Sequence, residues 1–223
     1  MSRRGAILAG AAVGLAVLLV GGDRVAAAAA ERAVSAEVVS AVGQVSSVST
    51  QVHGVPLLTQ VASGSLDHVT VQLDGVEAGG VPIDSLVVDV YDVATTSPRR
   101  AGRVEAVATV SIETVQAQAG EGWDVAVDGE ALLVTSTGLL PVQARLVPTV
   151  TDGSLGFDLA SVRIFGVTVD GDAVPDEVAA AVAGLDADLS DLPLGLEPTS
   201  VVVTPEGVVL SAAGTAVDLE GDR

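Results

Sequence analysis

Hydrophobic residues recur at helical spacing in the stretch that follows the apolar N-terminus. Residues 25–44 include five consecutive alanines, and neither proline nor glycine interrupts them before Gly43. Three valines fall on one side of the resulting helix, namely Val34, Val38 and Val42. Because a helix with one apolar side must bury that side, we expect it to pack against a sheet formed by the later sequence.

From residue 46 onward, apolar and polar residues alternate with the period of two that is typical of strands. The clearest example is 66–73, where Val69, Val71 and Leu73 share one face. Turn residues separate the strands and predict an antiparallel meander. The other predicted strands are 46–52, 83–93, 104–112, 123–127, 131–137, 142–150, 155–164, 201–204 and 208–217.

Short helical segments interrupt this series. Pro56 is suited to the first turn of a helix that places Leu57, Leu58 and Val61 on one side, and Gly64 is suited to end it. Residues 113–119 and 178–185 are also compatible with helices. The elements together predict an α+β fold.

Residues 5–22 are uncharged and apolar, and Arg3 and Arg4 precede them. A helix of this length spans about 27 Å, close to the thickness of a bilayer core. The arginines predict that the chain after this run is exported. The run is either an uncleaved anchor, which its length favours, or a signal peptide cleaved among the alanines that follow. We therefore expect 1–22 to be an anchor or signal segment and 23–223 to be a single extracytoplasmic domain.

Composition narrows the chemistry. Hydrophobic residues make up 49% of the chain but aromatic residues only 2%, so the core must be aliphatic. The net charge of -19, with no lysine, repels nucleic acid and anionic headgroups, so any lipid would be held by apolar burial. Cysteine is absent, which excludes disulfides and thiol nucleophiles.

No sequence motif for catalysis or cofactor binding is present. The chain lacks a G-x-S-x-G elbow, a phosphate-binding loop and a dinucleotide fingerprint. His53 and His68 are too few for a metal site. We expect no catalytic residue, no metal and no cofactor, and a hydrolase with an unrecognised acid pair is a distant alternative.

Several strands are apolar on both faces, at 86–90, 132–134 and 201–203. An antiparallel sheet normally exposes one face, so such a sheet is either covered on both sides or curls around a helix. A curled sheet with an aliphatic interior could accept acyl chains. Plain core packing explains the same pattern.

Five segments resemble the LmeA-like phospholipid-binding proteins of actinobacterial cell envelopes, and they occur in the same order along the exported chain. The most specific is G-V-P-L-L-T-Q at 54–60, in which Val55 and Leu57 replace the phenylalanines that often flank the proline. The others are D-R-V-A at 23–26, D-H-V-T-V at 67–71, L-P-L-G-L at 192–196 and V-T-P-E-G at 203–207.

The resemblance implies a fold similar to BPI-like tubular lipid-binding domains, in which a strongly curved antiparallel sheet cradles a long N-terminal helix. It also implies phospholipid binding at the cell envelope and a part in lipomannan-type lipoglycan synthesis. The expected partners are phospholipid, the cytoplasmic membrane through the N-terminal segment, and envelope glycosyltransferases. An envelope adaptor without lipid is the alternative.

We predict that an aliphatic groove between the helix and the sheet holds the acyl chains. Its lining would come from the helix, the proline segment and one strand. The predicted residues are Val34, Val38, Val42, Leu57, Leu58, Val61, Val69, Val71 and Leu73.

Overall fold

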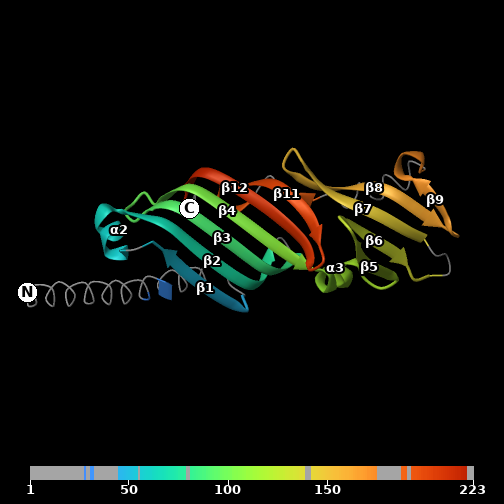
Figure 1. The fold of residues 1–223 in the computed structure, drawn as a ribbon, viewed down its shortest axis with the longest axis horizontal. Coiled ribbons are helices and arrows are strands. Elements are labelled where there is room, and N and C mark those ends of the chain that lie inside the picture. The colour runs from blue at the N-terminus through green and yellow to red at the C-terminus, as the bar shows by residue number, and fades with distance from the viewer. Residues whose placement is uncertain are drawn as a thin grey trace, which may run out of the picture.

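The computed structural model describes residues 28, 31–32, 45–54, 56–78, 81–138, 142–174, 187–189 and 192–219. Most of them belong to strands of two antiparallel sheets, which lie one after the other along the long axis of the molecule (Figure 1). No helix formed by these residues is long and apolar enough to cross a membrane. The apolar run at 5–22 lies outside the described residues.

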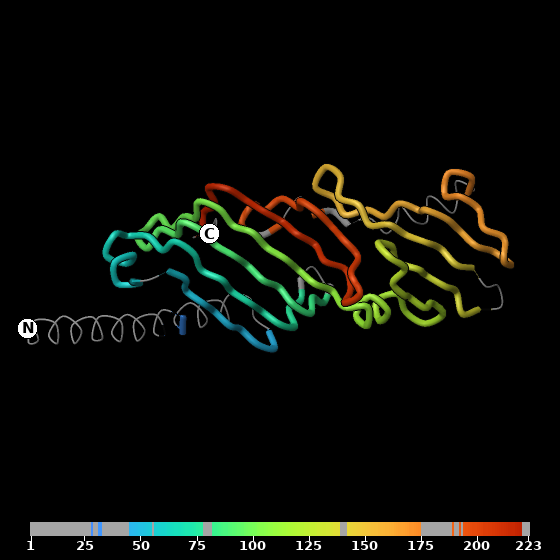
Figure 2. The backbone as a smooth tube through the Cα atoms, in the orientation of Figure 1, coloured from blue at the N-terminus to red at the C-terminus, as the bar shows by residue number. Residues whose placement is uncertain are grey.

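The first sheet, sheet A, has six strands in the order β1-β2-β3-β4-β12-β11. Its first four strands follow one another as the alternating pattern predicts. The hairpin β11–β12 then returns from the end of the sequence, and β12 pairs with β4 along its length, as the red and green strands in Figure 2 show. The strands are β1 (Ser47–His53), β2 (Ser65–Ala78), β3 (Val81–Ala94), β4 (Arg100–Ser111), β11 (Glu197–Thr204) and β12 (Gly207–Asp218).

The second sheet, sheet B, has the order β10-β8-β7-β6-β5, and β9 pairs with β8 beside this path. Asp152 and Gly153 join β7 to β8 with φ angles of 51° and 80°, which suit the tight hairpin that this dipeptide predicts. The strands are β5 (Trp123–Asp128), β6 (Ala131–Ser136), β7 (Val142–Thr151), β8 (Ser154–Ile164), β9 (Val167–Asp170) and β10 (Ala187–Asp188).

Two short α-helices form where local signals predict them. Helix α2 (Leu57–Ser63) begins after Pro56 and ends at Gly64, whose φ of 86° suits glycine. Helix α3 (Ile112–Ala119) begins after Ser111, whose hydroxyl accepts a hydrogen bond from the Thr114 amide at 3.2 Å. Two single turns of 3₁₀ helix complete the described elements, η1 (Gly171–Ala173) and η2 (Pro193–Gly195).

The predicted architecture, a long N-terminal helix cradled by one strongly curved sheet, was wrong. The described residues form two sheets and two short α-helices, and no long helix is among them. The segment predicted as that helix, 25–44, lies outside them except for Ala28, Glu31 and Arg32. The prediction chose a sheet curled around a helix, whereas the described residues form two sheets that pack together where β11 meets sheet B.

The core of the described residues is aliphatic, as the composition predicts. One cluster lies on β4 and β12 around Val104, whose side chain is fully buried. A second lies on β2 around Leu73. The third joins the two sheets, because Val203 of β11 packs with Leu132 and Leu146 of sheet B.

Candidate functional site

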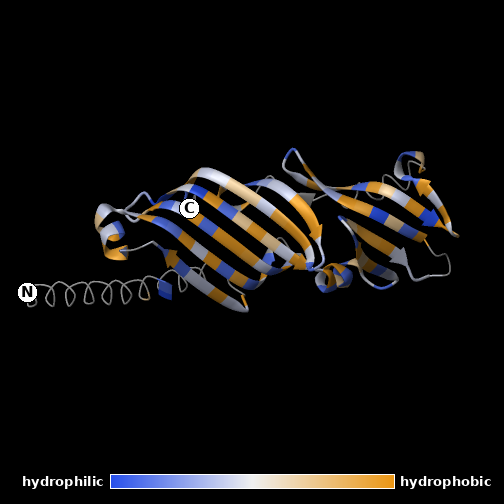
Figure 3. Ribbon diagram, in the orientation of Figure 1, coloured by the Kyte–Doolittle hydropathy of each residue, from blue (hydrophilic) through white to orange (hydrophobic). Residues whose placement is uncertain are grey.

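One face of sheet A is apolar across all six strands, because the strand register aligns their apolar positions. Figure 3 shows the resulting hydrophobic bands crossing the strands. One row takes a residue from each strand in turn: Val48, Leu73, Leu86, Ala108, Leu210 and Val201. The next row is formed by Thr50, Val71, Val88, Ala106, Ala212 and Pro198. We call this surface the apolar face of sheet A.

Burial on this face is uneven. Leu73 on β2 and Val104 on β4 are buried. Between them, Leu86, Val88 and Val90 on β3 remain only half-buried. Apolar side chains on this face therefore keep exposed area that a ligand could cover.

The segment after η2 crosses part of the apolar face of sheet A. Leu196 is buried there with Val104 and Ala212. Gly214 on β12 makes this close approach possible, since a β-carbon at that position would lie 2.9 Å from Cδ2 of Leu196. The covered part of the face lies over β4 and β12.

Sheet B continues the apolar surface. Val125, Leu132 and Leu146 are buried on one face of sheet B. They share their cluster with Val203 and Val208 of sheet A, which lie on the same face as Val201 and Leu210. The apolar faces of the two sheets therefore join where β11 meets sheet B.

The structure brings together three of the predicted groove residues. Val69, Val71 and Leu73 are buried in one cluster on the apolar face of sheet A. Leu57 on α2 is also buried. Leu58 and Val61 do not share its burial, because they are 48% and 50% exposed. The remaining predicted residues, Val34, Val38 and Val42, lie outside the described residues.

The other buried residue of α2 is Gln60, which the hydrophobic pattern did not predict as a site residue. The side-chain amide of Gln60 accepts a hydrogen bond from the Asp67 backbone at 2.9 Å and donates one to the His53 carbonyl at 3.3 Å. It therefore links α2 to both β1 and β2. A polar side chain on a short helix is normally expected to be exposed. The sequence does not show that the end of β1 and the start of β2 lie within reach of Gln60.

Gln116 on α3 makes an equivalent link to sheet B. Its side-chain oxygen accepts from the Val125 amide at 2.6 Å, and its side-chain nitrogen donates to the Trp123 carbonyl at 2.7 Å. The amide thus pairs with the outer edge of β5 as a neighbouring strand would. Ile112 and Val115, also on α3, pack into the cluster that joins the sheets.

The opposite face of sheet A carries a ladder of stacked side chains. His53, His68, Tyr91 and Arg103 are successive cross-strand neighbours on β1 to β4. The two histidine rings stack at 4.2 Å, His68 stacks on Tyr91 at 4.4 Å, and the Arg103 guanidinium lies 4.3 Å from the centre of the Tyr91 ring. The sequence did not predict that the two histidines stack, because their position as cross-strand neighbours depends on the register of β1 and β2.

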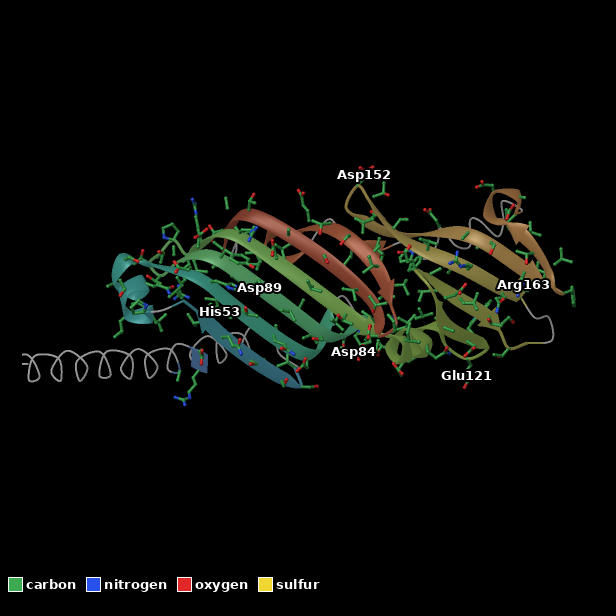
Figure 4. All side chains as sticks on the ribbon, viewed as in Figure 1. His53, Asp84, Asp89, Glu121, Asp152 and Arg163 are labelled. Atoms are coloured by element: carbon green, nitrogen blue, oxygen red, sulfur yellow. The ribbon has the colours of Figure 1, made fainter. Side chains whose placement is uncertain are left out.

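A hydrogen-bond chain runs beneath the ladder and ends at Asp89, which Figure 4 labels together with His53. His53 Nε2 lies 2.8 Å from the Thr70 hydroxyl, which donates to the Asp89 carboxylate at 2.6 Å, and His68 Nε2 lies 2.7 Å from the same oxygen. Burial raises the pKa of Asp89, but these hydrogen bonds and the charges of the histidines outweigh it and lower the pKa below its usual value. The ladder is thus a polar feature of the solvent face.

Polar side chains also gather on sheet B. A shallow depression of about 210 Å³ lies on the polar face of sheet B, where Arg145 forms an ion pair with Asp128 at 3.0 Å. Within the described part of the chain, no three histidine or carboxylate side chains are grouped so that they could hold a metal ion. The joined apolar surface, by contrast, extends over both sheets.

Comparison with known proteins gives one match. The sequence model of a protein family described as LmeA-like phospholipid-binding matches residues 21–213, which include nearly all of both sheets. Neither the curated proteins nor the solved structures compared contain a significant match.

Proposed function

The chain belongs to the LmeA-like phospholipid-binding family, and we propose that it holds phospholipid acyl chains on the joined apolar faces of sheets A and B. The observation that carries this proposal is the pair of rows across six strands, apolar at every position but Thr50, with half-buried residues along β3. Phospholipid binding is a property of the family, and the site on this chain is our assignment.

The dimensions of the apolar face of sheet A suit an acyl chain. Six strands at about 4.8 Å spacing are about 24 Å wide. One bilayer leaflet provides about 15 Å of hydrocarbon. An extended acyl chain therefore fits across the sheet, where each buried methylene contributes about 0.8 kcal/mol.

The chemistry of the rows indicates which part of the lipid provides affinity. The two rows contain one polar residue, Thr50, and no charged residue. The headgroup therefore finds no basic partner within the rows, and burial of the acyl chains drives binding. The proposed role is binding without chemical conversion of the lipid.

Two neighbouring valines on β3 provide a matched test. Val88 lies on the apolar face between Val71 and Ala106, whereas Val87 lies on the opposite face between Gln72 and Val107. Both are half-buried. We expect the full-length protein to carry phospholipid after purification, Val88→Asp to lose most of it, and Val87→Asp to retain it, because a carboxylate resists contact with hydrocarbon.

Organic extraction and mass spectrometry of each variant measure the bound lipid, and circular dichroism verifies folding. Val88→Asn, which adds polarity without charge, replaces Val88→Asp if the latter unfolds. Equal lipid in folded Val88 and Val87 variants would refute the assigned site. A wild-type protein that carries no lipid and takes up none when offered would favour the adaptor hypothesis.

We also propose that binding takes place outside the cytoplasm and supports lipoglycan assembly by envelope glycosyltransferases. The apolar run at 5–22 supports export and membrane attachment, and the family resemblance supports the link to lipomannan-type products. N-terminal sequencing of the mature protein would distinguish an anchor from a cleaved signal. Lipoglycan analysis of a deletion strain would test the second part.

A further inference from the structure

Sheet B exposes large apolar side chains at the turn between β8 and β9 and at the start of β5. Phe165 is 70% exposed, Val167 66%, Trp123 44% and Ile164 41%. Phe165 and Trp123 are two of only four aromatic residues in the chain. We call these four residues the tip.

Strand register places the tip residues at the same end of the strands, with Trp123 on the edge strand β5 and Val167 on β9 beside β8. Ile164 pairs with both Val142 and Val167, and Trp123 pairs with Ser136 on the neighbouring strand β6. Phe165 follows Ile164 in the turn between β8 and β9, at a positive φ of 50°. Figure 1 shows this turn at the extreme end of the molecule, and Figure 4 labels Arg163 beside it.

The tip continues the apolar face of sheet B. Ile164 lies two residues after Val162, so the two side chains share a face, and exposure rises from 3% at Val162 to 41% at Ile164. Trp123 stands in the same relation to the buried Val125 on β5. The joined apolar surface therefore extends, without a change of face, to the exposed end of the molecule.

We propose that the tip docks into the surface of a phospholipid bilayer and that lipid enters or leaves the apolar surface there. This inference rests on the proposed function. Tryptophan favours the boundary between headgroups and hydrocarbon, and phenylalanine is common on the apolar side of segments that bind at a membrane surface. Continuity between tip and apolar face means that an acyl chain can move from bilayer to protein without crossing a charged barrier.

Charge near the tip specifies the kind of bilayer. The charged residues within two positions of Trp123, Ile164 and Val167 are Glu121, Asp124 and Arg163. Their sum is negative, as is the charge of the whole chain. Anionic headgroups therefore repel this end at low salt, and a zwitterionic surface is the preferred partner.

The position of Trp123 is set by Gln116, which pairs with the backbone of β5 on both sides of Asp124. Because α3 also packs into the cluster that joins the sheets, the tip is attached to the rest of the molecule through a packed helix. Docking can therefore orient the whole apolar surface with respect to the bilayer.

The test uses Trp123, the single tryptophan of the chain, as a probe in the full-length protein. Vesicles of zwitterionic phosphatidylcholine are prepared with bromine on the acyl chains, which quenches tryptophan at the hydrocarbon boundary. We compare wild type, the triple variant Ile164→Ser/Phe165→Ser/Val167→Ser, and Val202→Ser. Val202 is a matched control, because it is 50% exposed on sheet A and lies outside the tip.

We expect Trp123 emission to shift to shorter wavelength and to be quenched in wild type and Val202→Ser. The triple variant should need at least about tenfold more lipid for the same quenching, since three apolar side chains no longer enter the bilayer. Half-replacement of phosphatidylcholine by anionic phosphatidylglycerol should weaken the response at low salt.

Lipid extracted from the same preparations separates this inference from the proposed function. Bound lipid together with unquenched Trp123, or equal quenching in the triple variant, would overturn docking by the tip while leaving lipid binding intact. Quenched Trp123 in a protein that never carries lipid would support docking and overturn the proposed function. If the triple variant does not fold, Phe165→Ser alone replaces it, because that side chain is the most exposed of the four.

Discussion

Replacing Gln60 by leucine should detach α2 from sheet A. The Gln60 side chain is only 9% exposed and bonds to the backbone of both β1 and β2. Leucine fills nearly the same space but leaves the Asp67 amide and the His53 carbonyl without this partner. The segment that contains Gln60 is also the most specific part of the family resemblance, so the variant tests what that glutamine does.

The two hydrogen bonds differ in strength, and this difference sets the expected loss. The bond from the Asp67 amide is 2.9 Å long and partly buried, whereas the bond to the His53 carbonyl is 3.3 Å long. An unsatisfied buried group costs about 1–3 kcal/mol, so one strong and one weak bond predict a loss of about 2–3 kcal/mol in the free energy of unfolding. In a chain of this size that loss lowers Tm by about 5–10 °C.

Thermal unfolding followed by circular dichroism measures the loss. Gln51→Leu is the control, because Gln51 is an exposed glutamine of β1, and its Tm should stay close to that of wild type. Gln60→Glu keeps the acceptor for the Asp67 amide but loses the donor, so its Tm should fall between those of the other two. A Gln60→Leu protein with the Tm of wild type would show that the amide does not hold the helix.

Two further predictions concern the stability of sheet A. Asp89 has a lowered pKa in the folded protein, so its contribution to stability is present above the pKa of the unfolded chain and is lost as pH falls through the folded value. Asp89→Asn should therefore lower Tm at pH 7, and this deficit should disappear below about pH 4. The control Asp124→Asn should show no such pH-dependent deficit, and a deficit of Asp89→Asn that is constant with pH would contradict the linkage. Gly207 begins β12 at a φ of 148°, and a β-carbon there would collide with the Val110 carbonyl oxygen. Gly207→Ala should therefore lower the free energy of unfolding, measured by chemical denaturation, by about 2 kcal/mol or more. Gly138→Ala should lower it little, because the nearest atom there is 3.5 Å from the added carbon. Equal losses in the two variants would refute the collision.

Elements with local signals could be predicted from the sequence. Helix α2 lies between Pro56 and Gly64 because proline is tolerated at a helix start and glycine adopts the positive φ of a helix end. Asp152 and Gly153 form a hairpin turn for the same kind of reason. These conformations depend on a few neighbouring residues, so the sequence pattern contains the relevant information.

Strand pairing could not be predicted in the same way. Every strand offers the same backbone donors and acceptors, so the alternating pattern of β12 does not show that it pairs with β4, about a hundred residues earlier. Strand β9, four residues long, was not predicted at all. Its pairing with β8 depends on the turn at Phe165 and Gly166, where both residues have positive φ.

The sequence by itself determined which residues share a strand face, because side chains alternate with a period of two wherever the backbone is extended. Val69, Val71 and Leu73 are therefore grouped in the structure as the pattern requires. Only the tertiary structure decided how faces from distant strands combine. Register placed Leu73 in one row with Leu210 and Val201 and brought Ile164 beside Val167. Such contacts depend on which chain segments meet. Bringing distant segments together costs the conformational entropy of the loop between them, and no local sequence pattern contains that quantity.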